Sequence, residues 1–465
     1  GAPSGAGAGG GAPSGRGGGE EARRARIARL VDLARVYRGW SAGELAEALG
    51  REASRAAPES GNPKLDLVRR LADALDWDAG DLVACLGGER PGVDCDGSGR
   101  PPRDRAAAER AAFLDGHAFG ALDAHAQRLH RGGRFGEMEE TAQAMMRAAG
   151  DGRARAIALN RLAGAHEGRG HYGRVVECVR RGLAERAIGD DVRLMLLVNL
   201  AGASYALWNL HESRAIAESL LERFLDRAPA GRLEAVGEAF CHAIRGHCLR
   251  RLVGEAEGES ERAACARRAG GALARAASLY DALHDRYGDA QYAMLARIAR
   301  GGLLETRVLS GELDGGEAIE IVLEAIDEDE GRRPDDARAT SAAPAPREST
   351  GWWSVFGANI ALRRAGEGLV AAGERDADER AVAICTNKAT EVGDALDLWT
   401  LRERAFTLGW FRRTVVAGPR DGEVDAWLLD DEDLRTLVGT MGRFPGFRPV
   451  GWRILERATV VSRDS

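Results

Sequence analysis

The stretch from Arg26 to Leu86 reads RIARLVDLARVYRGWSAGELAEALGREASRAAPESGNPKLDLVRRLADALDWDAGDLVACL. Its apolar residues, starting with Ile27 and Leu30, recur every three or four positions, which is typical of amphipathic helices. Ser41 and Glu44 stand three residues apart, as in a capping box, and predict the start of a second helix. The stretch therefore predicts a compact cluster of short helices separated by turns.

Two further helices are expected after the turn Ser60-Gly61-Asn62-Pro63, one at residues 65–75 and one behind Asp78 as its N-cap. This order of helices and turns resembles the helix-turn-helix domain of the phage-repressor-like regulators, the XRE family. The likeness is carried by short apolar pairs, turns and one helix face: Leu45-Ala46, Ala48-Leu49-Gly50, Gly61-Asn62-Pro63, the face of Leu67, Leu71, Ala72 and Leu75, and Asp81-Leu82-Val83.

The resemblance implies DNA binding, in which the helix at residues 51–57 enters the major groove. Base contacts are then expected from one set of side chains and phosphate contacts from another: Arg51, Ser54 and Arg55 for bases, and Arg38, Lys64 and Arg69 for phosphates. A second interpretation is a degenerate copy used for packing or protein contact. Pro58 interrupts the expected reading helix, and residues 21–90 contain 12 basic and 12 acidic side chains, which cancel.

The composition of the whole chain favours an all-α protein. It has 465 residues, of which 44% are hydrophobic and only 5% aromatic. The formal net charge of -7 means that any contact with nucleic acid must come from a local basic patch. The seven cysteines are scattered without a CxxC pair, so we expect reduced thiols in a cytoplasmic protein. No apolar run has the length of a membrane span, and no membrane partner is expected.

A loose repeat emerges from about Ala106 onward. Its copies read RGGRFGEMEETAQAMM, EGRGHYGRVVECVRRGL, ALWNLHESRAIAESLL and LSGELDGGEAIEIVL. Each copy places a helix end, a tight turn and a large apolar residue before a second helix. Phe135, Tyr172 and Leu210 are spaced by 37 and 38 residues, which suits a helical hairpin repeat. The pattern resembles tetratricopeptide repeats and implies an α-solenoid.

The resemblance to tetratricopeptide repeats implies a concave groove that holds a peptide or protein partner, or that pairs two copies of the chain as a homodimer. Asn160 and Asn199 lie on the first helices of successive repeats, where this family directs side chains at a bound peptide. Arg155, Arg193 and Asn359 are expected to add to the groove. The alternative is that these asparagines face solvent as ordinary polar residues of a helix surface.

We expect a small helix-turn-helix domain and a solenoid with linkers between them. The segments are a Gly/Ala/Pro/Ser tail at 1–19, the helix-turn-helix domain at 20–87, a linker at 88–105, helical repeats at 106–326, an acidic Pro/Ala linker at 327–350, and further repeats with a cap at 351–465. The tail at 1–19 and the linker at 327–350 are expected to be disordered, and the linker at 88–105 to be flexible, because these segments contain almost nothing that a core could bury.

No catalytic, metal or cofactor motif is found in the sequence. Cys241, His242, His247 and Cys248 are close together, but the two histidines project away from the face that the cysteines share. Buried thiols are therefore the preferred interpretation of these cysteines. The sequence predicts a DNA-binding transcriptional regulator with a partner-binding repeat domain. The alternative is a non-enzymatic adaptor that binds a protein through its repeats.

Overall fold

The computed structural model describes residues 17–52, 63–77, 79–87, 117–331, 345–366, 372–416 and 427–460. These residues are almost entirely helical, which confirms the prediction of an all-α fold. The strands among them are β1 (Trp427–Leu429) and β2 (Ala458–Val460), which pair in a two-stranded sheet. Among the residues that the structure describes, every helix is too short or too polar to cross a bilayer.

The chain forms two compact units, which we call the N-terminal unit and the repeat unit. The N-terminal unit contains the first four helices together with Leu428–Gly442 from near the end of the chain. Its helices are α1 (Gly17–Arg38), α2 (Ala42–Leu49), α3 (Leu65–Leu75), α4 (Ala79–Gly87) and α19 (Asp431–Arg443), the last of which crosses the boundary between the units at Arg443.

Local sequence fixes the ends of α2. The Ser41 backbone N–H donates to Glu44 Oε2 at 2.8 Å, and the Glu44 N–H donates to Ser41 Oγ at 3.3 Å, which confirms the predicted capping box. Gly50 ends the helix with φ of 63°, a left-handed conformation that glycine adopts without steric cost. Leu45 and Leu49 are buried, so this short helix presents its apolar face to the core of the unit.

Helix α19 completes the core of the N-terminal unit. Its apolar face, which includes Leu434 and Leu437, is buried. The Trp77 Nε1–H donates to the Val438 carbonyl at 3.2 Å, and Arg435 Nε donates to the Val36 carbonyl at 3.0 Å. The core of this unit therefore joins residues that are more than 350 positions apart in the sequence.

The repeat unit consists of helices that pack on their neighbours in chain order. It contains α6 (Phe119–Arg131), α7 (Phe135–Ala148), α8 (Gly152–Gly168), α9 (Tyr172–Ala184), α10 (Asp190–Ala206), α11 (Leu210–Glu222), α12 (Arg232–Leu252), η2 (Val253–Glu255), α13 (Glu259–Tyr287), α14 (Ala290–Leu309), α15 (Gly315–Gly331), α16 (Ala345–Gly366), α17 (Ala372–Ala395), α18 (Trp399–Phe411), the π-helical turn η4 (Arg412–Val416), η5 (Pro445–Phe447) and α20 (Arg448–Arg457).

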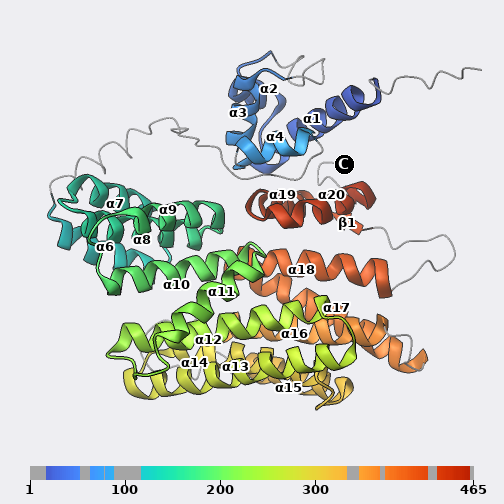
Figure 1. Cartoon of the computed structure of the whole chain (residues 1–465). Coiled ribbons are helices and arrows are strands. Elements are labelled where there is room, and N and C mark those ends of the chain that lie inside the picture. Colours follow the sequence, from blue (N-terminus) through green and yellow to red (C-terminus); the bar gives the residue numbers. More distant parts are fainter. Residues whose placement is uncertain are drawn as a thin grey trace, which may run out of the picture. The chain divides into compact units, whose positions relative to one another are not determined.

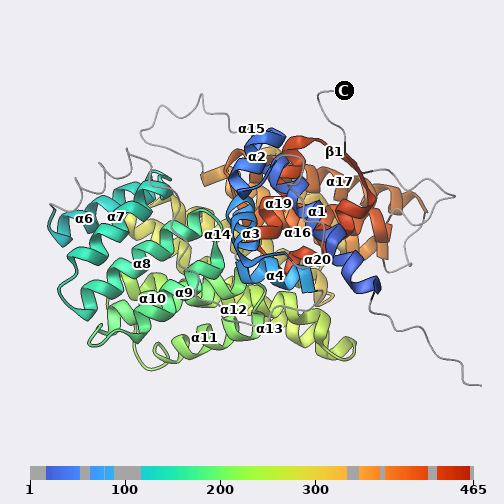
Figure 2. The same ribbon diagram turned by 90° about the horizontal axis from the view of Figure 1, so that it is seen from above.

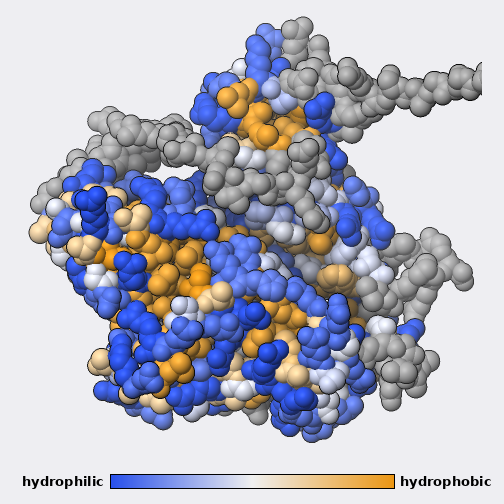
Figure 3. Space-filling model, in the orientation of Figure 1, coloured by the Kyte–Doolittle hydropathy of each residue, from blue (hydrophilic) through white to orange (hydrophobic). Residues whose placement is uncertain are grey.

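The packing of consecutive helices is solenoid-like, as predicted. Each helix contacts the next one, and helices two places apart in the chain, such as α8 and α10, also contact one another. Figures 1 and 2 show α6 to α11 side by side in two perpendicular views. In Figure 3, apolar residues gather over the region of α8 to α11 and are bordered by hydrophilic residues. The repeat unit therefore exposes apolar surface on this face.

One turn recurs between the helices of a pair. Gly133 and Gly170 adopt left-handed φ two residues before a new helix begins, as do Trp208 and Asp397. In each case the next backbone N–H donates to the carbonyl five residues before it, as His171 donates to His166 at 2.9 Å. This is the Schellman arrangement that ends an α-helix. The predicted equivalence of Phe135, Tyr172 and Leu210 is thus confirmed.

Helices extend into segments that we predicted to be disordered. Helix α1 begins at Gly17, inside the expected tail of residues 1–19. Helix α15 runs to Gly331 and α16 begins at Ala345, so the linker expected at 327–350 is helical at both ends. These helix ends are polar in composition, but extending a helix that has already formed costs little free energy for each added residue. The linker expected at 88–105 lies outside the described residues.

Candidate functional site

Buried charges meet where α12, α14 and α16 pack together. The Glu305 side chain is fully buried (0% exposed) and accepts from Arg250 Nη1 at 2.5 Å through its Oε2. Asn359 Nδ2 donates to the same oxygen at 3.3 Å, and Arg363 Nη2 lies 3.0 Å from Oε1. Asn359 and Arg363 are four residues apart, so α16 presents them on one face. Glu305 is therefore held by donors from two other helices.

A second ion pair lies on α18. Arg404 Nε donates to Glu403 Oε2 at 2.9 Å and its Nη2 donates to Oε1 at 3.0 Å. The Thr407 hydroxyl donates to Glu403 Oε1 at 3.0 Å. All three side chains are buried. Both oxygens of Glu403 are thus occupied, and the forked geometry fixes the plane of the Arg404 guanidinium group.

Trp208 contacts two guanidinium groups. The guanidinium carbon of Arg251 is 4.1 Å from the Trp208 ring centroid and 4.0 Å from that of Tyr205. The guanidinium carbon of Arg404 lies 4.3 Å from the Trp208 ring centroid. Trp208 has φ of 66°, which for a residue with a side chain costs about 1–2 kcal/mol. The contacts with the two arginines offset this cost, and a large aromatic residue stands where other repeats have glycine.

We call the four arginines Arg250, Arg251, Arg363 and Arg404 the arginine cluster. They carry four positive charges, and their paired carboxylates Glu305 and Glu403 carry two negative ones, so four minus two leaves two positive charges in excess. Burial, together with the charges of Arg404 and Arg250, lowers the pKa of Arg251 to about 10. The cluster therefore concentrates positive charge around two buried carboxylates; Arg250 and Arg404 are buried with them, whereas the Arg363 side chain is 41% exposed.

An open cavity of about 230 Å³ lies between α16 and α18 beside the cluster. Its walls combine the charged and polar groups described above with apolar side chains. The lining residues are Asn359, Leu362, Arg363, Arg404, Thr407, Leu408 and Phe411. Phe411 is 44% exposed, which is unusual for a large aromatic residue on a packed helix. The cavity thus offers two guanidinium groups next to an apolar wall.

His247 lies on α12, which also carries Arg250 and Arg251, and its side chain is uncharged. Its ring stacks on Phe356 with centroids 6.0 Å apart and planes inclined by 5°. The pKa of His247 is well below its ordinary value, because burial disfavours the imidazolium and the charges of Arg250 and Arg251 act in the same direction. Nδ1 is buried without a hydrogen-bond partner among the described residues.

Replacing His247 with glutamine is expected to reduce the loss of stability at acid pH. The folded protein holds this imidazole neutral, whereas the unfolded chain protonates it at its ordinary pKa of 6.5. Stability from this group is present above that pH and is lost below it, by about 1.4 kcal/mol per pH unit between about pH 6.5 and pH 5. Urea unfolding of both proteins across this range measures the difference. Equal slopes for the two proteins would contradict the assignment.

The predicted groove residues divide into separate contacts. Asn199 Nδ2 donates to Asn160 Oδ1 at 2.7 Å, so the structure brings these two side chains together from α10 and α8. Arg155 Nε donates to Glu185 at 3.0 Å, and Arg193 is exposed. The fifth residue of the set, the α16 asparagine, instead joins the arginine cluster through Glu305. Because Asn160 and Asn199 are hydrogen-bonded to each other, each has fewer donor and acceptor positions left for a bound peptide.

The predicted DNA contacts are only partly described by the structure. Ser54 and Arg55 lie outside the described residues. Arg51 follows the C-cap of α2 and is partly buried, whereas Lys64 is the exposed N-cap of α3. The two remaining residues, Arg38 and Arg69, make contacts within the N-terminal unit.

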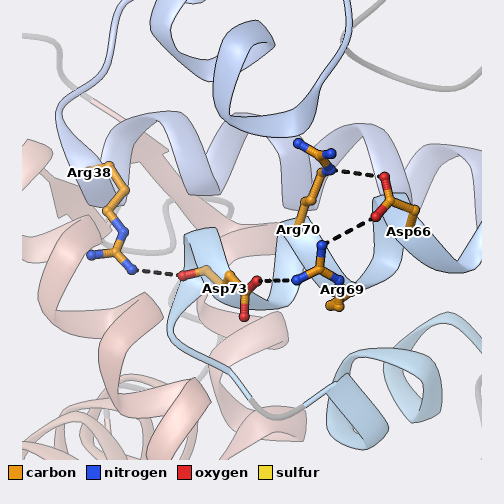
Figure 4. Close-up of polar contacts among 5 residues, drawn as sticks. All are labelled: Arg38, Asp66, Arg69, Arg70 and Asp73. Atoms are coloured by element: carbon orange, nitrogen blue, oxygen red, sulfur yellow. Dashed lines mark hydrogen bonds and ion pairs between the residues drawn. The ribbon is translucent and has the colours of Figure 1, made fainter. Parts of the chain in front are cut away.

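Figure 4 shows these internal contacts. Arg38 donates from Nη2 to the Asp73 carbonyl at 2.8 Å, near the C-terminal end of α3. Its Nε also donates to the Ala74 carbonyl at 2.7 Å, a contact that the figure does not draw. Arg69 lies 3.3 Å from Asp66 and 3.5 Å from Asp73. These side chains are exposed, so their pairs contribute little to stability and can exchange for phosphate contacts.

None of the arginines of the cluster was predicted as a site residue, and only Asn359, which donates to the same Glu305 carboxylate, was named from the sequence. A signal was present at Glu305, which follows the apolar residues Leu303 and Leu304 in the run GLLETRVL of α14. A carboxylate in the middle of an apolar helix face requires a buried partner. The partners could not be found in the same way, because Arg250 and Arg363 are more than 50 residues away in opposite directions.

The cysteines near the middle of the chain are buried and free. Cys241 and Cys248 lie in the core and form no disulfide, which confirms the interpretation as buried thiols. Burial raises the pKa of Cys241 to about 12, so the thiol is protonated at neutral pH. Within the described part of the chain, no three His, Cys, Asp or Glu side chains are grouped so that they could hold a metal ion.

The fold and the site define an all-α protein with a solenoid-like repeat unit and a cluster of arginines around two buried carboxylates. A comparison with models of protein families gives no match to the chain. A search of curated proteins also finds no match.

Proposed function

We propose that this protein is a cytoplasmic DNA-binding regulator in which the repeat unit binds a ligand and the N-terminal unit binds DNA. The observation that carries the ligand-binding half is the excess of positive charge beside the cavity between α16 and α18, which Arg363 and Arg404 line. Such a cluster weakens the fold unless an anion neutralises it, and perturbed charges in a concavity are typical of binding sites.

The N-terminal unit supports the DNA-binding half through its helices and their charge. Helix α1 contains six arginines against three acidic residues, so this part of an acidic protein has a local excess of positive charge. The capping box of α2 and its C-cap at Gly50 follow the pattern on which the resemblance to phage-repressor-like regulators was based. The expected reading helix falls in the interval between α2 and α3.

The path of the chain supports a coupling between the two halves. The chain leaves the repeat unit after Trp427, contributes α19 to the N-terminal unit, and returns to the repeat unit at Arg443. A change in the placement of α18 on ligand binding would therefore act on a helix that is built into the core of the N-terminal unit. In a homodimer this would alter the fit of two DNA-binding units to their half-sites.

The double change Arg51→Ala plus Arg55→Ala is expected to weaken binding of the full-length chain to genomic DNA fragments by at least tenfold. Two side chains assigned to base edges are lost, and each good base contact contributes about 1–3 kcal/mol. Fluorescence anisotropy with labelled fragments at several salt concentrations measures affinity. The logarithm of the binding constant should fall linearly with that of the salt concentration, because bound DNA releases counterions.

A matched control is Arg267→Ala plus Arg268→Ala, two exposed arginines of α13 in the repeat unit. This variant changes the net charge by the same amount and should bind DNA as the wild type does. Absence of DNA binding by the wild type at low salt would refute the proposal that the protein is a DNA-binding regulator. It would favour the adaptor, which the engagement of Arg38 and Arg69 within the N-terminal unit also supports. The exposed apolar face in Figure 3 would then be its contact surface.

A further inference from the structure

We infer that the cavity between α16 and α18 binds a carboxylate that is attached to an apolar group, with Arg363 and Arg404 as the residues that hold the carboxylate. The inference rests on the ligand-binding half of the proposed function and specifies the chemistry of the ligand. It does not depend on DNA binding. The cavity, the two guanidinium groups and the apolar wall are all formed by helices of the repeat unit.

The guanidinium groups have donors left for a ligand. Each guanidinium carries five N–H groups, and the hydrogen bonds of Arg404 to Glu403 use Nε and Nη2. Arg363 contacts Glu305 through Nη2, and its side chain is 41% exposed, so the rest of the group faces the open side of the cavity. A planar fork of N–H donors matches the two oxygens of a carboxylate.

The charge balance favours an anion of low charge. The cluster has two positive charges in excess, and a carboxylate would neutralise one of them without leaving buried negative charge. Glu305 and Glu403 are paired with arginines of the cluster, and their negative charges repel further negative charge in the cavity. A phosphate, which carries more charge and is not planar, would meet this repulsion more strongly. The pKa of Arg251 is lowered by burial and by its positive neighbours, so an anion bound nearby would stabilise its charged form.

The rest of the cavity lining is largely apolar. Leu362, Leu408 and Phe411 line it, and Phe411 exposes almost half of its surface. Covering such a ring with an apolar group removes it from water at about 25 cal/mol per Å² of buried surface. A small organic acid with an aromatic or aliphatic body has this chemistry, and so does the C-terminal residue of a peptide that ends in a large apolar side chain.

Isothermal titration calorimetry on the full-length chain tests the inference with matched acids and amides. The probes are phenylbutanoate and phenylbutanamide for a small acid, and acetyl-alanyl-alanyl-phenylalanine with a free or an amidated carboxyl group for a peptide end. At least one acid should bind, and its amide should bind at least tenfold more weakly, because the charge-assisted hydrogen bonds are lost. Binding by only one of the two acids identifies the source of the carboxylate.

Arg363→Gln is expected to weaken binding of that acid by about 10- to 100-fold, and Arg363→Lys, which keeps the charge without the fork, by less. The matched control is Arg300→Gln, because Arg300 is a similarly exposed arginine of the repeat unit with one ion pair, to Asp281. Phe411→Ala should weaken phenylbutanoate but leave any binding of acetate unchanged. Thermal unfolding of each variant checks that it is folded.

Three results would overturn the inference. Neither acid binds the wild type, the amide binds as tightly as its acid, or Arg300→Gln weakens binding as much as Arg363→Gln does. Tighter binding of inorganic phosphate than of both acids would also overturn it. Because none of these measurements involves DNA, a failure here leaves the test of DNA binding untouched, and a protein without DNA affinity can still bind the acid.

Discussion

Replacing Glu305 with leucine is expected to lower the free energy of unfolding of the repeat unit by about 3–5 kcal/mol. The carboxylate is fully buried and is the ion-pair partner of Arg250, whose side chain is only 5% exposed. Without it, the Arg250 guanidinium remains in a place that water does not reach, with no opposite charge beside it. The loss of the carboxylate costs less at Arg363, because its side chain is partly exposed and its charge can be hydrated.

Urea unfolding followed by circular dichroism measures this effect in the full-length chain. The matched control is Asp281→Leu, which removes the acid of the exposed pair with Arg300 and should cost less than about 1 kcal/mol. The double change Arg250→Met plus Glu305→Leu should recover most of the loss, since a buried ion pair can be replaced by apolar residues of similar volume. If Glu305→Leu were as mild as the control, the carboxylate would not be needed to neutralise Arg250.

The repeated turn could be predicted because its determinants are local. A helix end, a residue suited to left-handed φ and a large apolar residue lie within a few positions of each other, as at Gly133 and Gly170. The copy at Trp399 escaped notice because Asp397 takes the place of glycine there. Trp208 shows the opposite case, in which the spacing was recognised but the conformation of the tryptophan could not be foreseen.

The charged site could not be predicted from the sequence because it is assembled over long distances. Arg250, Glu305 and Arg363 come from α12, α14 and α16, and each one alone resembles an ordinary charge of a helix surface. Which charges become buried depends on how the helices stack. Sequence periodicity gives the face of a helix but not the neighbour that covers it.

The same limit applies to the boundaries of the units. We expected residues 351–465 to form further repeats with a cap, yet Leu428–Gly442 belongs to the N-terminal unit. The apolar spacing of α19 indicates a buried face, but nothing in the residues themselves says that Trp77 lies against it. A hydrogen bond between residues 361 positions apart is a property of the folded chain alone.

Replacing Trp77 with alanine is expected to destabilise the N-terminal unit by about 3–5 kcal/mol and to release α19 from it. The ring is only 4% exposed, and its N–H donates to the Val438 carbonyl. It also lies so close to Gly442 that a side chain there would meet the ring at 2.4 Å. The substitution leaves a large cavity between α3 and α19 and removes the hydrogen bond to the Val438 carbonyl, and both losses weaken the same contact.

Hydrogen exchange followed by mass spectrometry of the full-length chain distinguishes this from general unfolding. Peptides from residues 65–77 and 431–442 should exchange faster in Trp77→Ala, whereas peptides from α8 and α13 should keep their protection, because they belong to the repeat unit. Trp77→Phe serves as the control, since it keeps most of the ring and loses only the hydrogen bond, at a cost of about 1 kcal/mol from that bond. Unchanged protection of residues 431–442 in Trp77→Ala would show that α19 is held by other contacts, of which Arg435 with the Val36 carbonyl is the next to test.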